Sequence, residues 1–238
     1  MKIVAVIPCY NEARTITEIV DEAKRYVDEV IVADDSSSDE TVAKARAAGA
    51  KVICNSNSHR GTGANTKRGM SVVDADIIVT LDGDGQHLPN EISSVLAPLL
   101  SGEADLVIGS RFMGEYKIAR YRKFGIDVIT FLYNFGRRQK VVDSQSCFRA
   151  FTRGLLDSVN IEERGFGFST EFLIKARARG YKIVEVPITC VYHKEYAQNS
   201  SSNPVIHGLS VAWATIKWRI KEELLRHERL GQRRKFEV

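Results

Sequence analysis

Two carboxylates and an amide follow an apolar run and together could bind a hard metal ion. The apolar residues 77–81 stop at an Asp-Gly pair, which predicts a buried strand that ends in a polar loop. Side chains two residues apart on an extended chain point the same way, so Asp82, Asp84 and Gln86 can face one point. Oxygen ligands of this kind suit Mg²⁺ or Mn²⁺ better than zinc. A lone Asp-x-Asp is more often a solvated turn, so this prediction depends on the surrounding sequence.

The elements that must position these residues are strands and helices in alternation. Apolar runs predict strands at residues 2–7, 29–33, 51–54, 76–81 and 104–109, with helices ending near residues 26, 48 and 102 and one more following Gly63. Ser37 and Glu40 match a capping box that would open the helix ending at Gly49. Repeated strand-helix units predict an α/β fold, with a mostly parallel central sheet covered by helices on both faces.

Polar clusters follow three of the predicted strands, at residues 8–12, 34–38 and 82–86. Ligands of such sheets bind beyond the carboxyl ends of the strands, so we expect the three clusters to converge on one crevice. Other phosphate or nucleophile motifs fail. The dinucleotide fingerprint lacks its third glycine after Gly63, and the sequence has no Walker A motif, calcium-binding loop or Gly-x-Ser-x-Gly elbow.

The composition suits one large globular domain with a C-terminal appendage. A net charge of +4 over 238 residues is too weak to indicate nucleic-acid binding. The four cysteines are scattered without metal-ligand spacing, which fits a reducing, cytosolic compartment. The N-terminal residues form a strand pattern rather than a signal peptide, and no run approaches the roughly 18 to 20 apolar residues that span a bilayer. Any membrane contact is therefore expected to be peripheral.

Six motifs carry a family resemblance. They are residues 7–12 (Ile-Pro-Cys-Tyr-Asn-Glu), 34–41 (Asp-Asp-Ser-Ser-Ser-Asp-Glu-Thr), 82–87 (Asp-Gly-Asp-Gly-Gln-His), 109–112 (Gly-Ser-Arg-Phe), 143–150 (Asp-Ser-Gln-Ser-Cys-Phe-Arg-Ala) and 180–187 (Gly-Tyr-Lys-Ile-Val-Glu-Val-Pro). In this order they resemble the family 2 glycosyltransferases of the Rossmann-like GT-A fold, and within them the dolichyl-phosphate mannose synthase group. The resemblance covers roughly residues 1–195 and implies a catalytic domain at residues 1–204, with an amphipathic helix and basic tail at 205–238.

The resemblance assigns the first three motifs to a nucleotide-sugar donor, a GDP- or UDP-hexose. The donor contacts that it implies are Pro8, Tyr10, Asn11, Glu12, Ala33, Asp35, Asp82, Gly83, Asp84 and Gln86. Asp84 and Gln86, with Asp82 beside them, would hold Mg²⁺ or Mn²⁺, which neutralises the diphosphate as it leaves. Tyr10 offers a ring face to the base, and carboxylates such as Glu12 and Asp35 accept ribose or base hydrogens. The alternative for residues 34–39 is a capped turn.

A phosphate acceptor needs cations more than it needs a base. A phosphate monoester, with a second pKa of about 6, is already largely dianionic at neutral pH. A guanidinium matches phosphate geometry, although either Arg111 or Arg149 could instead form a structural ion pair. The predicted acceptor contacts are Arg111, Ser146, Arg149, His193 and Lys194, and the predicted catalytic residues are Asp84 and Arg111. His193 departs from the family, since polyprenyl-phosphate transferases usually have Arg there, and Lys194 would supply the missing charge.

Residues 116–140 combine an apolar stretch with basic flanks, which is typical of a helix that lies in the bilayer interface. The alternative is a core helix with solvated basic ends. A second helix is expected at about 205–229, because four apolar residues follow one another there at helical spacing: Trp213, Ile216, Ile220 and Leu224. The basic tail behind it could contact anionic lipid, and the helix could equally form a dimer contact or cover the sheet.

Together the motifs predict a metal-dependent inverting glycosyltransferase at the cytoplasmic membrane face that moves a hexose to dolichyl or polyprenyl phosphate. The oligomeric state is left open, and no nucleic-acid partner is expected. One alternative is a hydroxyl acceptor, with Glu171 as its base. A second is a sugar-nucleotide nucleotidyltransferase, which the absence of a Gly-rich triphosphate loop with a following Lys disfavours. A third is a catalytically silent binding module.

Overall fold

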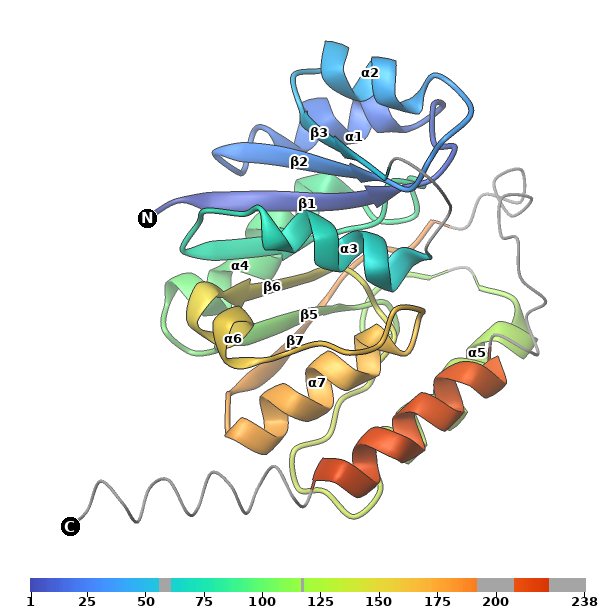
Figure 1. Ribbon diagram of the computed structural model, residues 1–238. Coiled ribbons are helices and arrows are strands. Elements are labelled where there is room, and N and C mark those ends of the chain that lie inside the picture. The colour runs from blue at the N-terminus through green and yellow to red at the C-terminus, as the bar shows by residue number, and fades with distance from the viewer. Residues whose placement is uncertain (56–60, 117, 192–207, 223–238) are drawn as a thin grey trace.

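A central sheet of seven strands lies between two layers of helices in the computed structural model, which describes residues 1–55, 61–116, 118–191 and 208–222 (Figure 1). The strands are β1 (Ile3–Cys9), β2 (Glu29–Asp34), β3 (Lys51–Cys54), β4 (Ile77–Thr80), β5 (Leu106–Ser110), β6 (Arg149–Thr152) and β7 (Ile183–Pro187). Their order is β3-β2-β1-β4-β6-β5-β7. All neighbouring pairs are parallel except the two that β6 makes, with β4 and β5.

Both faces of the sheet are buried under helices. On one face lie α1 (Ile16–Ala23), α2 (Thr41–Ala47) and α4 (Ile92–Leu100), which the 3₁₀ turn η1 (Pro89–Glu91) precedes. On the other lie α3 (Thr62–Ser71), α6 (Arg153–Ser158) and α7 (Phe168–Arg179). Alternate residues of β1 divide between the two cores: Ala5 and Ile7 face the first, Val4 and Val6 the second. Burial on both faces explains why the five predicted strands contain continuous apolar runs.

An outer layer of two helices covers α7. It consists of α5 (Arg120–Asn134) and a helix at residues 208–222, which lie beside each other in Figure 1. Tyr133 and Trp218 extend from these helices into the second core. None of the helices that the structure describes is both long and apolar enough to cross a bilayer.

The predicted α/β class and mostly parallel sheet are confirmed, and each of the five predicted strands is present. The capping box predicted at Ser37 is wrong, because α2 begins only at Thr41 and its N-cap residue, Glu40, makes no side-chain cap bond. The Ser37 hydroxyl instead accepts the backbone N–H of Asn11 at 2.8 Å, and the Asp39 carboxylate accepts the N–H of Thr41 at 2.9 Å. Ser37 therefore joins two loops rather than opening a helix.

A matched pair of helical glycines tests how closely α3 packs on the sheet. A Cβ on Gly69 of α3 would lie 2.5 Å from Val6 Cγ1, whereas a Cβ on Gly125 of α5 would have no neighbour within 4 Å. Gly69→Ala should lower the free energy of unfolding by about 1 to 3 kcal/mol through overpacking. Gly125→Ala should leave it unchanged or raise it by up to about 1 kcal/mol through helix propensity. Urea unfolding checks both, and equal stabilisation by the two changes would contradict the close packing.

Candidate active site

The loops that follow β1, β2 and β4 are hydrogen-bonded to one another at one edge of the sheet. The N–H of Asp35 donates to the Cys9 carbonyl at 2.9 Å. The Thr15 hydroxyl, on the turn into α1, donates to the Gly83 carbonyl at 2.6 Å. These bonds, with the Asn11–Ser37 contact, bring the three predicted polar clusters together.

Left-handed backbone keeps the first two loops tight. Asn11 has φ of 58° and Ser36 has φ of 68°. Residues other than glycine seldom adopt this conformation, which costs of order 1 kcal/mol or more unless the surroundings hold it. The Asn11 amide oxygen accepts the N–H of Ser38 at 2.8 Å, so the Asn11 side chain links the loop after β1 to the loop after β2.

Three carboxylates crowd the edge of the sheet. Burial, then the charges of Asp84 and Asp82, raise the pKa of Glu12 to about 8. Burial and Asp84 likewise raise the pKa of Asp82 to about 7, although the Arg111 charge opposes the shift. Each carboxylate therefore disfavours the ionised form of the others, and a cation placed among them would relieve that repulsion.

The two predicted metal ligands contact each other directly. Asp84 accepts the Gln86 side-chain amide at 2.6 Å and the Gln86 N–H at 3.0 Å. In the described ranges, no group of three or more His, Cys, Asp or Glu side chains is arranged to hold a metal ion. One carboxylate and one amide, with Asp82 beside them, still fit Mg²⁺ or Mn²⁺, because such ions keep several positions for water and phosphate oxygens.

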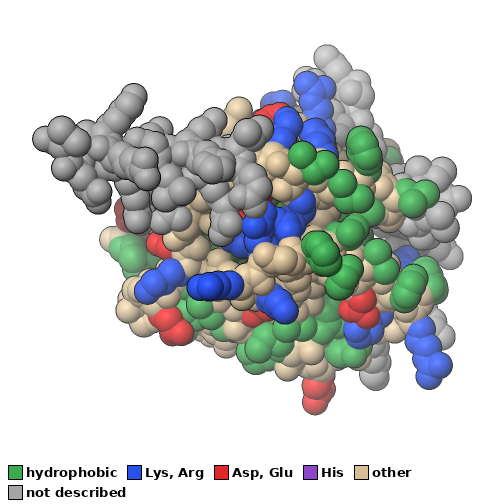
Figure 2. Space-filling model, turned by 90° about the horizontal axis from the view of Figure 1, so that it is seen from below, with side chains coloured by type: hydrophobic (Ala, Val, Ile, Leu, Met, Phe, Trp, Pro, Cys, Tyr) green, Lys and Arg blue, Asp and Glu red, His purple; other side chains and the backbone are tan. Residues whose placement is uncertain are grey.

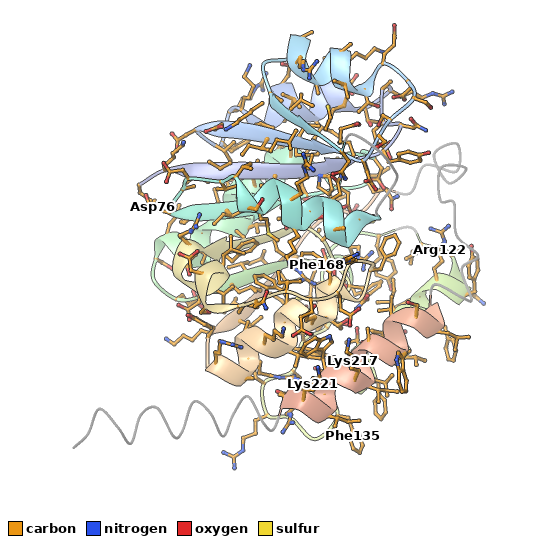
Figure 3. The ribbon with its side chains drawn as sticks, viewed as in Figure 1. Asp76, Arg122, Phe135, Phe168, Lys217 and Lys221 are labelled. Atoms are coloured by element: carbon orange, nitrogen blue, oxygen red, sulfur yellow. The ribbon has the colours of Figure 1, made fainter. Side chains whose placement is uncertain are left out.

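The predicted nucleoside contacts lie around the ends of β1 and β2. Asp35 is buried, and its carboxylate accepts the Asn55 amide at 2.7 Å and the Gly61 N–H at 2.9 Å. Ala33 is fully buried inside β2, with its carbonyl bound by the Asn65 amide. Tyr10 is half-buried. A pocket with about 250 Å³ of empty space, part of it open to solvent, adjoins them; it is lined by Pro8, Thr66, Thr80, Leu81, Asp82, Cys147, Arg149, Phe168 and Ser169. Figure 3 labels Phe168, at the start of α7.

Arg111 follows β5 and is clamped by Asp143. Its Nε and Nη2 donate to the two carboxylate oxygens at 2.7 and 2.8 Å. Burial opposes ionisation of Asp143, but the charge and hydrogen bonds of Arg111 outweigh it and hold the pKa of Asp143 below its usual value. Arg111 is thus a structural ion pair, the alternative noted above. It also lies near enough to Asp82 to lower the pKa of that carboxyl.

Arg149 begins β6 and differs from Arg111 in its partners. Its Nη1 and Nη2 donate to the carbonyls of Ser169 and Ser144 at 2.9 and 3.0 Å, and its buried Nε has no hydrogen-bond partner. Burial lowers its pKa, and no described carboxylate forms an ion pair with it. Ser146 is fully buried and its hydroxyl accepts the Phe148 N–H at 3.3 Å. His193 and Lys194 lie outside the described residues.

The structure gives a place in the site to two residues of the motifs at 143–150 and 82–87 to which the sequence assigned no role. Asp143 lies 32 residues from Arg111, so no local pattern announces the pair. His87 is buried with Nδ1 at 3.8 Å from Asp82, and burial, then Arg111, lower its pKa to about 3. It is therefore neutral beside the acidic cluster. The position of His87 directly after the 82–86 loop was the sequence signal that could have indicated its place in the site.

Glu171, the base considered for a hydroxyl acceptor, is bound within a structural network. It is fully buried, accepts the N–H groups of Glu162 and Glu163 at 2.8 and 2.7 Å, and pairs with Lys175 at 2.6 Å. Both of its oxygens are therefore occupied by groups of the protein itself, which leaves it unsuited to take a proton from a substrate.

Comparison with known proteins gives one family. A model described as "Glycosyl transferase family 2" matches residues 4–159. A UDP-N-acetylglucosamine–dolichyl-phosphate N-acetylglucosaminyltransferase of Methanococcus voltae is 32% identical, over 84% of this chain and 90% of its own. A dolichyl-phosphate hexose transferase of Haloferax volcanii is 29% identical, over 90% and 92%. A glucosyl-3-phosphoglycerate synthase from Mycobacterium tuberculosis, solved with Mn²⁺, UDP and phosphoglyceric acid, shares the fold with a TM-score of 0.72 at 23% identity, over 91% and 78%.

Replacing Asp143 should expose the strength of its pairing with Arg111. Asp143→Asn should lower the free energy of unfolding by about 3 kcal/mol at neutral pH, because it leaves a largely buried guanidinium without a counter-charge. A carboxyl whose folded pKa is depressed stabilises above its unfolded pKa, and this contribution is lost as the pH falls through the folded value. The difference from wild type should therefore shrink below about pH 4.

Urea unfolding at several pH values measures this difference. Asp127→Asn, which removes an exposed partner of Lys123, is the control and should cost under about 0.5 kcal/mol. An equal loss in the two variants, or an Asp143→Asn loss that does not change with pH, would contradict the prediction.

Proposed function

The chain belongs to glycosyl transferase family 2 and is a glycosyltransferase, and on that basis we propose that it transfers a hexose from a nucleotide sugar to a polyprenyl phosphate of the dolichyl type. The observation that carries the proposal is the charge arrangement at the sheet edge. A cluster of carboxylates lies beside two guanidinium groups, Arg111 and Arg149, that are held apart from it by other partners.

The acidic cluster suits the diphosphate end of the donor. Asp84 and Gln86, with Asp82 beside them, would hold Mg²⁺ or Mn²⁺, which when bound neutralises the diphosphate charge. Asp35 and Tyr10 lie toward the nucleoside end, beyond β2 and β1. The names of the relatives differ in the sugar, so the donor is proposed as a class, a GDP- or UDP-hexose.

The cations suit a phosphate acceptor. A phosphate dianion is nucleophilic without a base, so the protein needs to orient it and balance its charge. Arg149 is more available for that charge balance than Arg111, because its Nε has no hydrogen-bond partner and no carboxylate contacts it. In the proposed reaction the acceptor oxygen attacks the anomeric carbon in line, and the bond from that carbon to the diphosphate oxygen breaks. Inversion at the anomeric carbon follows.

A lipid-linked acceptor requires that the enzyme work at a membrane surface. We place it at the cytoplasmic face, in peripheral contact, with α5 as one contact element. Five large hydrophobic side chains of residues 120–135 are exposed, namely Tyr121, Phe124, Val128, Phe131 and Phe135. A helix with such a face and basic flanks lies along an interface rather than crossing it.

Labelled donors test the reaction directly. Incubation with a panel of radiolabelled UDP- and GDP-sugars, polyprenyl phosphate and Mn²⁺ should move label into the organic phase for at least one donor. Asp84→Asn should reduce that transfer by about 100-fold or more, because the metal ion that would neutralise the leaving diphosphate loses a carboxylate ligand. Asp76→Asn, at the opposite edge of the sheet in Figure 3, should leave it unchanged. Label that stays in the aqueous phase for every donor would defeat the acceptor assignment.

The acceptor class is tested by two buried charges. With a short-chain polyprenyl phosphate, Arg149→Lys should lower kcat/KM by about tenfold or more, because an ammonium lacks the planar fork of the guanidinium. Glu171→Gln should retain turnover in proportion to its folded fraction, measured by circular dichroism. If Glu171→Gln abolished turnover in folded protein while Arg149→Lys did not, a hydroxyl acceptor would be favoured instead.

A further inference from the structure

The helix at residues 208–222 is apolar on two opposite sides. Its inner side packs on α7 through Val211, Ala214, Thr215 and Trp218, all at most 5% exposed. The Trp218 indole donates to Glu163 at 3.0 Å, and the Thr215 hydroxyl donates to Thr170 at 3.2 Å. These contacts fix which side of the helix faces the protein.

The other side presents large hydrophobic residues to solvent. Leu209 is 66%, Trp213 69%, Ile216 38% and Ile220 72% exposed, and we call these four residues the outer stripe. Their spacing of four, three and four residues places them on one face of a helix. A helix that only covered the core would carry polar residues there. The packing on α7 therefore leaves the outer stripe exposed, and an exposed apolar stripe of this kind is typical of a contact surface.

Buried charges hold this helix against α5. Glu222 is fully buried, and its carboxylate pairs with Arg137, Arg177 and Arg219. Arg219 also donates from Nε to the Leu132 carbonyl at 3.2 Å and from Nη2 to the Phe135 carbonyl. The end of α5 and the end of the second helix are thus fastened to the same carboxylate.

The two helices consequently present their exposed apolar side chains as neighbours. Figure 2, which views the molecule from below, shows hydrophobic side chains gathered beside a cluster of Lys and Arg. In Figure 3, Phe135 points away from the sheet at one end of α5, and Arg122 lies toward the other end.

The charges around this surface have one dominant sign. Arg120, Arg138, Lys140 and Lys221 are exposed. In α5 and residues 208–222 the only carboxylates are Asp127, which pairs with Lys123, and the buried Glu222. A second copy of this surface would bring cations against cations, whereas an anionic lipid surface complements them. Aromatic and aliphatic side chains between cations match the interfacial region of a bilayer.

We propose that the outer stripe and the exposed face of α5 form one two-helix surface that inserts into the interfacial layer of an anionic membrane. This extends the membrane contact of the proposed function to a second helix and makes residues 208–222 part of the docking surface. Leu209, Trp213, Ile216 and Ile220 enter the acyl boundary, and the flanking cations contact lipid phosphates.

Vesicle sedimentation without donor or acceptor tests the surface separately from the transfer reaction. Wild type should bind vesicles of phosphatidylcholine and phosphatidylglycerol in equal parts more tightly than vesicles of phosphatidylcholine alone. Trp213→Ser with Ile220→Ser should weaken binding by about tenfold or more, and Phe124→Ser with Phe131→Ser in α5 should do likewise. The control is Leu100→Ser, a 51% exposed residue of α4 on the other side of the sheet, which should change binding by less than about twofold.

Three results would overturn the proposal. The first is wild-type vesicle binding by Trp213→Ser with Ile220→Ser, which would confine the surface to α5. The second is a dimeric wild type and a monomeric variant, measured by light scattering without lipid, which would assign the outer stripe to contact with a second copy of the chain. The third is equal binding to both vesicle compositions. Transfer to a short-chain soluble acceptor should stay at the wild-type rate in this variant, so loss of docking is distinguishable from failure of the proposed reaction.

Discussion

The arrangement of charge at the sheet edge depends on the buried carboxylate of Asp143. It accepts the Arg111 guanidinium and the N–H groups of Arg111, Gln145 and Ser146. Glu185 of β7 in turn accepts the N–H of Asp143 at 2.9 Å. If Arg111 paired with Asp82 instead, the protein would neutralise its own acidic cluster. Because Asp143 satisfies the guanidinium, Arg111 stays close to the acidic cluster without forming an ion pair with it, and the carboxylates remain available to a cation.

The outer layer uses a buried carboxylate differently. Glu222 binds three guanidinium groups from three segments, so it fastens helices together and leaves no charge directed at the site. Lys175, stacked over Trp218 at 3.8 Å and paired with Glu171, adds to the same layer. The chain therefore separates the charges that hold these helices together, at Glu222 and Glu171, from the charges that line the pocket, at Asp82 and Arg149.

The five predicted strands could be read from the sequence because each contains an apolar run that ends in polar residues, as at Leu81 and Asp82. β6, with the sequence Arg-Ala-Phe-Thr, and β7, with Glu185 at its centre, have no such run and were not predicted. The grouping of the loops followed from parallel strand geometry. The partners of side chains were not predictable. Ser37 matched a helix cap in the sequence, but its hydroxyl accepts the N–H of Asn11, which lies 26 residues away in another loop. Trp213 and Trp218 occupy one helix, yet one is 69% and the other 2% exposed, and only the position of α7 decides which. The antiparallel direction of β6 likewise depends on how the chain returns after α5.

The antiparallel strand β6 contributes to the site differently from the parallel strands. The parallel strands end at the site, so their last residues lie there. β6 runs the other way and begins at the site, so its first residue, Arg149, lies there, opposite Thr80 of β4 and Ile108 of β5. The segment before it, residues 143–148, thus reaches the edge from outside the repeating strand-helix units. β4 holds this segment in place, because the Thr80 hydroxyl donates to the Cys147 carbonyl at 2.8 Å. The carboxylate of Asp82 and the guanidinium of Arg149 are therefore supplied by strands that run in opposite directions, and the antiparallel pairing of β4 with β6 sets one against the other.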